Sequence, residues 1–167
     1  MATKEHTFDL SAKVDIQELK NAIEQTKKEI DNRYDFKNDS VKEIQFDEKH
    51  KAITITATSD NKLNAIQDVL HSKLTKRSLS LKTLTESKRE SASGGNMRLV
   101  LNVNDTLKDD DIRKINQLIK KQNFKVVSNI MGNEIRFKSK SIDELQSVIA
   151  FLKGAEIESP LSFSNFK

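Results

Sequence analysis

The sequence predicts an α+β fold built from two modules of the order β-α-β-β-α-β, and three observations support this prediction. Segments that alternate apolar and polar residues, as half-buried strands do, are interspersed with segments that carry an apolar stripe at helical spacing. The same order of elements occurs twice along the 167 residues. Residues 132–154 form a complete strand–helix unit with its turn and caps, and an earlier segment repeats it. This order is the ferredoxin-like pattern, a four-stranded antiparallel sheet with both helices on one face.

The strand of this unit separates apolar from cationic side chains. It follows Gly132 and Asn133, two residues that tolerate the positive φ of a tight hairpin turn. In the next six residues, Ile and Phe alternate with Arg136 and Lys138. We therefore expect one face of the strand to be buried under helices and the other face to carry cations.

The helix of this unit is repeated earlier in the chain. Ser141 is its predicted N-cap, with Glu144 at the capping-box position, and Gly154 ends it. The earlier segment 52–70 aligns with the unit without a gap, at a spacing of 82 residues. A shared cap and a shared stripe indicate a duplicated module. The matched positions include Ile53/Ile135, Ser59/Ser141, Leu63/Leu145 and Leu70/Leu152.

The remaining elements follow from the same two periodicities. In the first module we predict a strand at 6–13, a helix from Asp15 to about Arg33, strands at 41–46 and 52–58, a helix from Ser59 or Asp60 to about Arg77, and a strand over 79–84. In the second module we predict a strand at 98–103, a helix opened by Thr106 and Asp109, strands at 125–131 and 134–140, a helix over 141–154, and a strand at 161–166.

The segment between the modules has no apolar periodicity. Residues 86–96 are rich in serine and contain Gly94-Gly95, which is typical of a linker or a long hairpin loop. The sequence therefore predicts a boundary here, with modules over residues 1–90 and 91–167.

Composition excludes several classes of protein. The chain has no cysteine, so we expect no disulfide framework and no cysteine-based catalysis or metal site. No apolar run approaches the roughly 20 residues of a membrane span, and the first residues lack the apolar core of a secretion signal. These features suit a reducing cytoplasm. The net charge of +4 is too small by itself to indicate nucleic-acid binding.

Local charge is more informative than the total. Between residues 120 and 140 there are six basic residues against one acid, Glu134. Alternation places Arg136 and Lys138 on the sheet face away from the helices, with Arg98 on a neighbouring strand and Lys125 nearby. Such cations can hold a phosphate group, although charge runs more often form an ordinary solvated face.

A second candidate surface surrounds an aromatic pair near the end of the first helix. Tyr34 and Phe36 lie between Arg33 and Lys37, an arrangement that could stack a base beside two cations. The alternative, which we favour, is that Phe36 belongs to the core. The aromatic signature of RNA-recognition domains is absent from both central strands.

No motif in the sequence indicates catalysis. The three histidines are scattered without a partner at metal-ligand spacing, and Gly94-Gly95 lacks the Lys-Ser/Thr of a phosphate loop. Three aspartates at 109–111 open a helix, where they complement its positive end. We therefore expect no enzyme activity and no cofactor or metal.

Several runs of residues resemble one bacterial family, the YajQ proteins. The runs are VDIQELKNA at 14–22, RYDFK at 33–37, LTKR at 74–77, GNEIR at 132–136, DELQ at 143–146 and LSFSNF at 161–166. They cover nearly the whole chain in order. The segment 86–96 resembles the family least.

The resemblance implies two ferredoxin-like modules that exchange their leading strands. The strand at 6–13 would then pair with the strand at 134–140, and the strand at 98–103 would join the one at 52–58. Arg98 would leave the face that carries Arg136, so that the basic cluster would be divided between the modules.

The resemblance also implies a non-enzymatic function. It implies binding of nucleotides or RNA and, as for some members of the family, of cyclic di-GMP. The resemblance does not fix the contacts, so the residues are chosen from the charge pattern. We expect phosphate capture by Arg136, Lys138, Lys125 and Arg98, with help from Arg33, Lys37, Lys76 and Arg77. Stacking of a base on Tyr34 or on an arginine plane would be secondary. The alternative is a protein–protein adaptor whose open sheet face or strand edge binds a transcription factor or a ribosome-associated protein.

Overall fold

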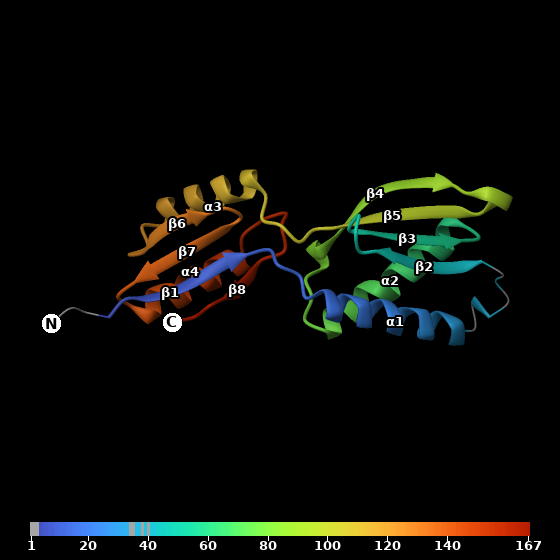
Figure 1. Cartoon of the computed structure of the whole chain (residues 1–167), viewed down its shortest axis with the longest axis horizontal. Helices are drawn as coiled ribbons and strands as arrows, with labels where there is room; N and C mark the ends of the chain where they lie inside the picture. Colours follow the sequence, from blue (N-terminus) through green and yellow to red (C-terminus); the bar gives the residue numbers. More distant parts are fainter. Residues whose placement is uncertain (1–3, 34–35, 38, 40) are drawn as a thin grey trace. The chain divides into compact units, whose positions relative to one another are not determined.

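The structure is a computed structural model that describes residues 4–33, 36–37, 39 and 41–167 (Figure 1). The chain forms two compact units. We call Val14–Asn104 the central unit, and Asp105–Lys167 together with the start of the chain up to Lys13 the terminal unit. Each unit contains one four-stranded sheet.

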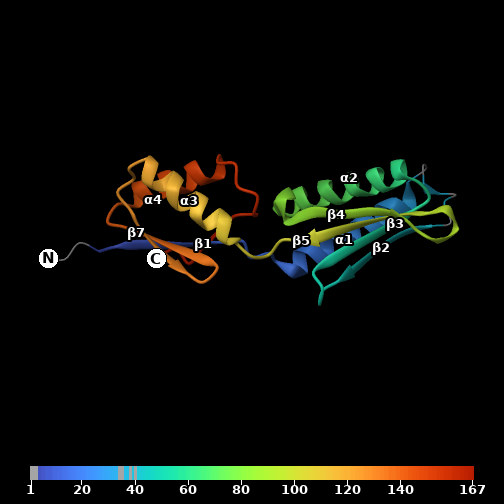
Figure 2. The ribbon, with the colours of Figure 1, turned by 90° about the horizontal axis from the view of Figure 1, so that it is seen from above.

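The terminal unit combines the first strand with the last third of the chain. Its sheet has the order β6-β7-β1-β8 with antiparallel neighbours, and Figure 2 shows both helices on the same side of β1 and β7. Its elements are β1 (His6–Ser11), α3 (Asp109–Lys121), β6 (Val127–Met131), β7 (Glu134–Ser139), α4 (Ile142–Lys153) and β8 (Ser162–Ser164).

The central unit has the same architecture. Its antiparallel sheet has the order β2-β3-β5-β4, and α1 and α2 contact each other beneath it (Figure 1). Its elements are α1 (Ile16–Asn32), β2 (Lys42–Asp47), β3 (Ala52–Ala57), α2 (Asp60–Lys76), the 3₁₀ turn η2 (Leu81–Thr83), β4 (Leu84–Ser91), the 3₁₀ turn η3 (Ser93–Gly95) and β5 (Met97–Val103).

The predicted α+β fold of two ferredoxin-like modules is confirmed, and each module takes the leading strand of the other. In the terminal sheet, β1 pairs with β7, with Phe8 opposite Phe137. In the central sheet, β5 pairs with β3, with Leu99 opposite Ile55. The chain therefore passes between the units twice, after Lys13 and after Asn104.

The predicted N-caps agree with the structure at three of the four α-helices. The side chains of Asp15, Ser59 and Ser141 each accept a hydrogen bond from the backbone N–H three residues ahead. The exception is α3, which begins at Asp109 after Lys108 without a side-chain cap, so the prediction that Thr106 opens this helix is wrong. The three aspartates of its first turn complement the helix dipole instead.

The segment before β5 also differs from the prediction. Residues 81–83 form the 3₁₀ turn η2, and the strand begins only at Leu84. Residues 84–91 then pair with β5 across a bulge between Glu86 and Lys88. Of the two interpretations of residues 86–96, the hairpin is therefore correct, and the expected boundary at 90/91 falls inside it. Most residues of this edge strand are polar or charged and exposed, so its sequence does not show the alternation of apolar and polar residues that predicts a strand.

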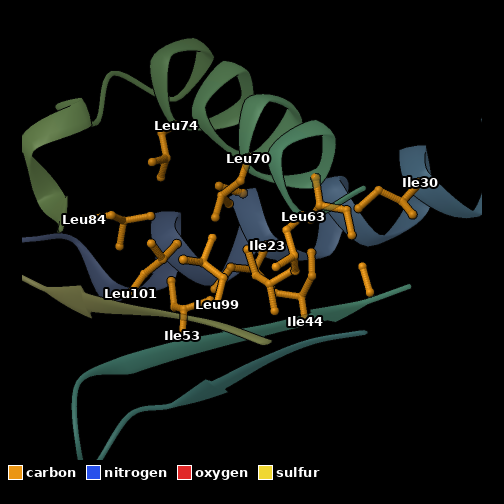
Figure 3. Close-up of a cluster of buried hydrophobic side chains, with 14 of the residues drawn as sticks. Ile23, Ile30, Ile44, Ile53, Leu63, Leu70, Leu74, Leu84, Leu99 and Leu101 are labelled. Atoms are coloured by element: carbon orange, nitrogen blue, oxygen red, sulfur yellow. The ribbon is translucent and has the colours of Figure 1, made fainter. Parts of the chain in front are cut away.

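Each unit has its own hydrophobic core between sheet and helices. In the central unit, side chains from β3 and β5 meet those of α1 and α2 (Figure 3). In the terminal unit, Phe8 and Phe137 are fully buried, and their rings stack at 5.1 Å between centroids. Phe36 is also fully buried, which confirms the core interpretation for this residue. Tyr34 lies outside the described residues.

Among the described helices, none combines the length and the hydropathy that a membrane-spanning segment requires.

Candidate functional site: a lysine pocket beside the terminal sheet

The sheet face of the terminal unit that points away from its helices carries polar side chains. Phe8 on β1 and Phe137 on β7 turn toward the helices. The side chains next to each of them along its strand therefore point to the opposite face. Arg136 lies opposite Asp9 on β1 and Asn129 on β6. Lys138 lies opposite Val127 on β6. The predicted outward orientation of both cations thus follows from strand alternation.

Arg136 is engaged by a buried carboxylate. Its Nε and Nη2 donate to the two oxygens of Asp9 at 2.8 and 3.2 Å, and Asn165 Nδ2 donates to the same carboxylate at 2.9 Å. The Asp9 side chain is 2% exposed and that of Arg136 39%. Because two of its five N–H donors are committed, Arg136 is a weaker candidate for phosphate binding than its sequence position suggests.

These contacts shift the ionisation of the pair. The hydrogen bonds from Arg136 lower the pKa of the Asp9 carboxyl, with a further contribution from Asn165, against the opposing effect of burial. Asp9 in turn raises the pKa of Arg136. The folded state therefore holds Asp9 ionised, and its charge is compensated within the sheet.

We expect Asp9→Asn to lower the free energy of unfolding by about 2 kcal/mol at pH 7, since hydrogen bonds between charged groups are lost. The folded pKa of Asp9 lies below its unfolded value, so the pair stabilises the fold above about pH 4 and this stability is lost as pH falls through the folded pKa. Urea unfolding at pH 7 and at pH 3 should show the difference between wild type and variant shrinking at the lower pH. A difference that is the same at both pH values would contradict this assignment.

Three lysines surround a hollow at one end of the same sheet, which we call the lysine pocket. It has a volume of 540 Å³. Lys125 precedes β6, Lys138 lies on β7 and Lys140 follows β7, while Ser139 Oγ ties these segments together by donating to the Lys125 carbonyl at 2.9 Å. The described residues that line it are Glu5, Phe124, Lys125, Val126, Val127, Asn129, Lys138, Ser139 and Lys140.

The lysine pocket has a surplus of positive charge. Against its three lysines, Glu5 is the one carboxylate among the described residues that line it. Two other pockets have no such surplus. One, of 350 Å³ in the central unit, includes Lys27 and Lys42 with two acids, and one of 280 Å³ in the terminal unit contains Lys13, paired with Glu134 at 2.8 Å, and a second acid, Asp105. An anion is therefore best accommodated in the lysine pocket.

Arg98 does not join this site. It lies on β5 in the central sheet, opposite Thr56, and its Nη1 contacts Glu90 Oε1 at 3.3 Å. The strand exchange thus puts Arg98 in a different sheet from Arg136 and Lys138, whereas the pairing of β6 with β7 brings Lys125 and Lys138 to one pocket.

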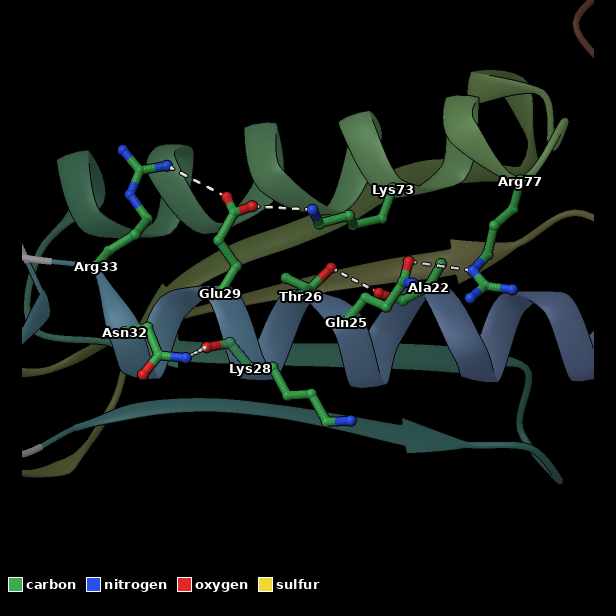
Figure 4. Close-up of polar contacts among 9 residues, drawn as sticks. All are labelled: Ala22, Gln25, Thr26, Lys28, Glu29, Asn32, Arg33, Lys73 and Arg77. Carbon is green, nitrogen blue, oxygen red and sulfur yellow. Dashed lines mark hydrogen bonds and ion pairs between the residues drawn. The ribbon is translucent and has the colours of Figure 1, made fainter.

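Two other predicted cations, Arg33 and Arg77, lie at the ends of α1 and α2 in the central unit (Figure 4). Arg77 Nη1 contacts Glu18 at 2.9 Å and its Nε donates to Gln25 at 3.2 Å, so it joins the end of α2 to α1. Arg33 lies 3.7 Å from Glu29, which also accepts from Lys73 at 2.9 Å.

The ion pair of Glu29 with Lys73 helps to hold α1 against α2. The hydrogen bond from Lys73 lowers the pKa of the Glu29 carboxyl, and the charges of Arg33 and Lys76 act in the same direction. Lys37 is exposed beside the buried Phe36. Arg33, Lys37, Lys76 and Arg77 therefore belong to the central unit, whereas the lysine pocket belongs to the terminal unit.

The structure adds residues that sequence reasoning missed. Asp9 follows Phe8 in the alternation of β1, so its outward orientation was readable, but its pairing with Arg136 required knowledge that β1 neighbours β7. Phe124 and Val126, in the connection from α3 to β6, supply an apolar wall to the lysine pocket. No local pattern distinguishes them from core residues.

Within the described residues, no group of three or more His, Cys, Asp or Glu side chains is placed to hold a metal ion. His50 contacts Asp47 at 2.7 Å on the surface of the β2–β3 turn.

Fold and pocket together define a protein of two strand-exchanged ferredoxin-like modules, with a cationic hollow beside one sheet. The chain belongs to the family described as nucleotide-binding protein YajQ-like, whose family model matches residues 6–167. The family resemblance predicted from the sequence is therefore confirmed.

Relatives of nearly the same length carry names that refer to nucleotide binding. A nucleotide-binding protein of Campylobacter concisus (strain 13826) is 49% identical over 163 residues, with 98% of each chain covered. One from Sulfurovum sp. (strain NBC37-1) is 47% identical over 165 residues, covering 98% of this chain and 99% of that protein. One from Campylobacter jejuni subsp. jejuni serotype O:2 is 44% identical over 163 residues. These names describe binding and no catalysed reaction.

Proposed function

We propose that this protein binds nucleotides without transforming them, and that the lysine pocket holds their phosphate groups. The observation that carries the proposal is the convergence of Lys125, Lys138 and Lys140 around one hollow with a single carboxylate, Glu5. The family to which the chain belongs is named for nucleotide binding, which supports the same class of ligand.

The pocket offers two kinds of contact. Three ammonium groups can each donate charge-assisted hydrogen bonds to phosphate oxygens. Phe124 and Val126 provide an apolar wall for a base or sugar. The volume of 540 Å³ lies within the usual range of about 300–1,000 Å³ for ligand pockets.

The described side chains around the pocket offer few hydrogen-bonding groups for a base, which favours a ligand recognised mainly through its phosphate groups. Around the lysine pocket, side-chain amide and hydroxyl groups are limited to Asn129 and Ser139 among the described residues, and Ser139 Oγ is used by the Lys125 carbonyl. The proposed ligands are therefore nucleoside polyphosphates, cyclic di-GMP or single-stranded RNA, and affinity should follow phosphate charge.

We expect binding to weaken steeply with salt. If three lysines contact three phosphates of a single-stranded RNA, the affinity should fall about 20-fold between 50 and 200 mM salt. Fluorescence anisotropy with a labelled RNA oligonucleotide, a labelled nucleoside triphosphate and labelled cyclic di-GMP measures this. The corresponding unphosphorylated nucleoside serves as a control and should not compete. Salt-independent binding, or equal competition by the nucleoside, would refute phosphate capture.

A further inference from the structure

The edge strand β6 differs from the other exposed strand edges of the two sheets. The sheet orders leave four edges, β6 and β8 in the terminal unit and β2 and β4 in the central unit. Edge strands usually carry charges, bulges or proline, or are very short, because an unprotected edge pairs with other chains. The four edges differ in this protection.

Three of the edges carry such protection. Strand β2 has the sequence KEIQFD with three charges, and β4 has the sequence LTESKRES with four charges and a bulge. Strand β8 has only three residues and follows Pro160 closely. Strand β6, with the sequence VSNIM, has no charge, no proline and no bulge.

Strand β6 also exposes apolar side chains. Val127 is 61% exposed, Ile130 55% and Met131 38%. Four of its five residues are exposed. An uncharged edge with three exposed apolar side chains is typical of a strand that acquires a partner.

We propose that β6 pairs antiparallel with β6 of a second copy of this chain, which joins two terminal sheets into one continuous sheet. A two-fold axis perpendicular to the sheet makes such an interface self-complementary. This proposal goes beyond the proposed function, although Val127 and Asn129 of the paired edge also line the lysine pocket.

The hairpin geometry selects the register of this pairing. Met131 and Glu134 lie opposite each other across the two-residue turn, in which Gly132 has φ 62°. Two residues that flank such a turn exchange both backbone hydrogen bonds with each other. Along the strand, backbone N–H and C=O groups then point alternately toward the partner strand and toward the free edge. Met131, Asn129 and Val127 thus direct their backbone groups to β7, whereas Ser128 and Ile130 direct theirs to the free edge.

Full overlap of the five residues places Asn129 opposite itself on the two-fold axis. Ser128 then exchanges hydrogen bonds with the partner's Ile130, which gives four hydrogen bonds by symmetry. Val127 lies opposite the partner's Met131 on the same face, so that exposed apolar side chains cover each other. Other even registers shorten this overlap, and odd registers would place open-face residues opposite helix-face residues.

Charge is compatible with this arrangement. The lysine pocket lies at the beginning of β6. Glu134, opposite Met131 on β7, lies away from the free edge and is paired with Lys13 at 2.8 Å. The two copies of Lys125 are roughly 25 Å apart along the strands, well beyond the screening length of about 8 Å at physiological salt. The two lysine pockets therefore do not repel each other.

The area involved implies a weak and transient dimer. A pair of five-residue strands buries less than the ~1,200 Å² of a stable interface. The association should therefore be detected by trapping, and the chain is well suited to this because it contains no cysteine.

The test is a single-cysteine variant, Asn129→Cys. In the proposed register the two Cα atoms of this position form a non-hydrogen-bonded pair about 4.5 Å apart, within the range for a disulfide. With oxidised glutathione, we expect at least tenfold more disulfide-linked dimer on non-reducing gels than with Gln45→Cys, which places an exposed cysteine on the charged edge β2.

Two further variants test register and edge. Met131→Cys would lie roughly 14 Å from its copy and should cross-link no more than Gln45→Cys. Adding Val127→Lys to Asn129→Cys introduces an edge charge and should reduce the dimer yield to the control level. Equal yields for Asn129→Cys and Gln45→Cys, or a yield that Val127→Lys leaves unchanged, would overturn the proposal.

Discussion

Replacement of both Lys125 and Lys138 by glutamate is expected to reduce nucleotide affinity about 100-fold. Each lysine lines the lysine pocket, and a hydrogen bond between charged groups contributes roughly 1.5 kcal/mol or more. Loss of two such bonds amounts to about 3 kcal/mol, and tenfold in affinity corresponds to about 1.4 kcal/mol. The new carboxylates also repel phosphate. Anisotropy titration of a labelled nucleoside triphosphate at 50 mM salt measures the change.

The matched control is Lys28→Glu with Lys82→Glu. Both lysines are exposed in the central unit, and neither lines one of the three pockets described above. The two double variants change the net charge equally. A comparable loss of nucleotide affinity in both would therefore mean that binding depends on the overall charge of the protein. Retained affinity in the Lys125/Lys138 variant would refute the lysine pocket as the phosphate site. Arg136→Ala should have a smaller effect on affinity, since Asp9 already occupies its guanidinium.

Phe137→Ala is expected to lower the free energy of unfolding by about 4 kcal/mol. Phe137 is fully buried in the middle of the terminal sheet and stacks on Phe8 at 5.1 Å between ring centroids. Truncation removes this contact and leaves a cavity that strands β1 and β7 cannot close, because they are held by paired backbones. Urea unfolding followed by far-ultraviolet circular dichroism should show a lower midpoint.

Phe166→Ala serves as the comparison for this substitution. Phe166 also contacts the ring of Phe8, at 5.9 Å, but it is 58% exposed. Its truncation should therefore cost about 1 kcal/mol or less, since water already reaches the ring. If the two variants were equally destabilised, the buried Phe8–Phe137 stack would not be the centre of the terminal core.

Local features of this fold were predictable because they depend on neighbours in sequence. The caps at Asp15, Ser59 and Ser141 require only a side chain and a backbone N–H three residues ahead. The outward orientation of Arg136 and Lys138 requires only strand alternation. The duplicated pattern identified both modules for the same reason.

Features that depend on a distant neighbour were less predictable. The predicted start of a helix at Thr106 was wrong, since α3 begins at Asp109. The predicted strand over 79–84 was also wrong in its bounds, since residues 81–83 form a 3₁₀ turn and the strand begins at Leu84. In the candidate site, Lys125 and Lys138 were identified from local charge. The apolar wall from Phe124 and Val126 was missed, since its position depends on packing against the terminal core, where the Phe124 ring contacts that of Phe151.

The sequence by itself determined the two α+β modules, their helix caps and the cationic face of residues 134–140. Only the tertiary structure decided which strand lies beside that face, because backbone hydrogen bonds between strands are the same for any pair of partners. The choice of β1 in place of β5 gives Arg136 the carboxylate of Asp9 and removes Arg98 to the other sheet. The family resemblance implied this exchange, but the composition and spacing of the residues could not.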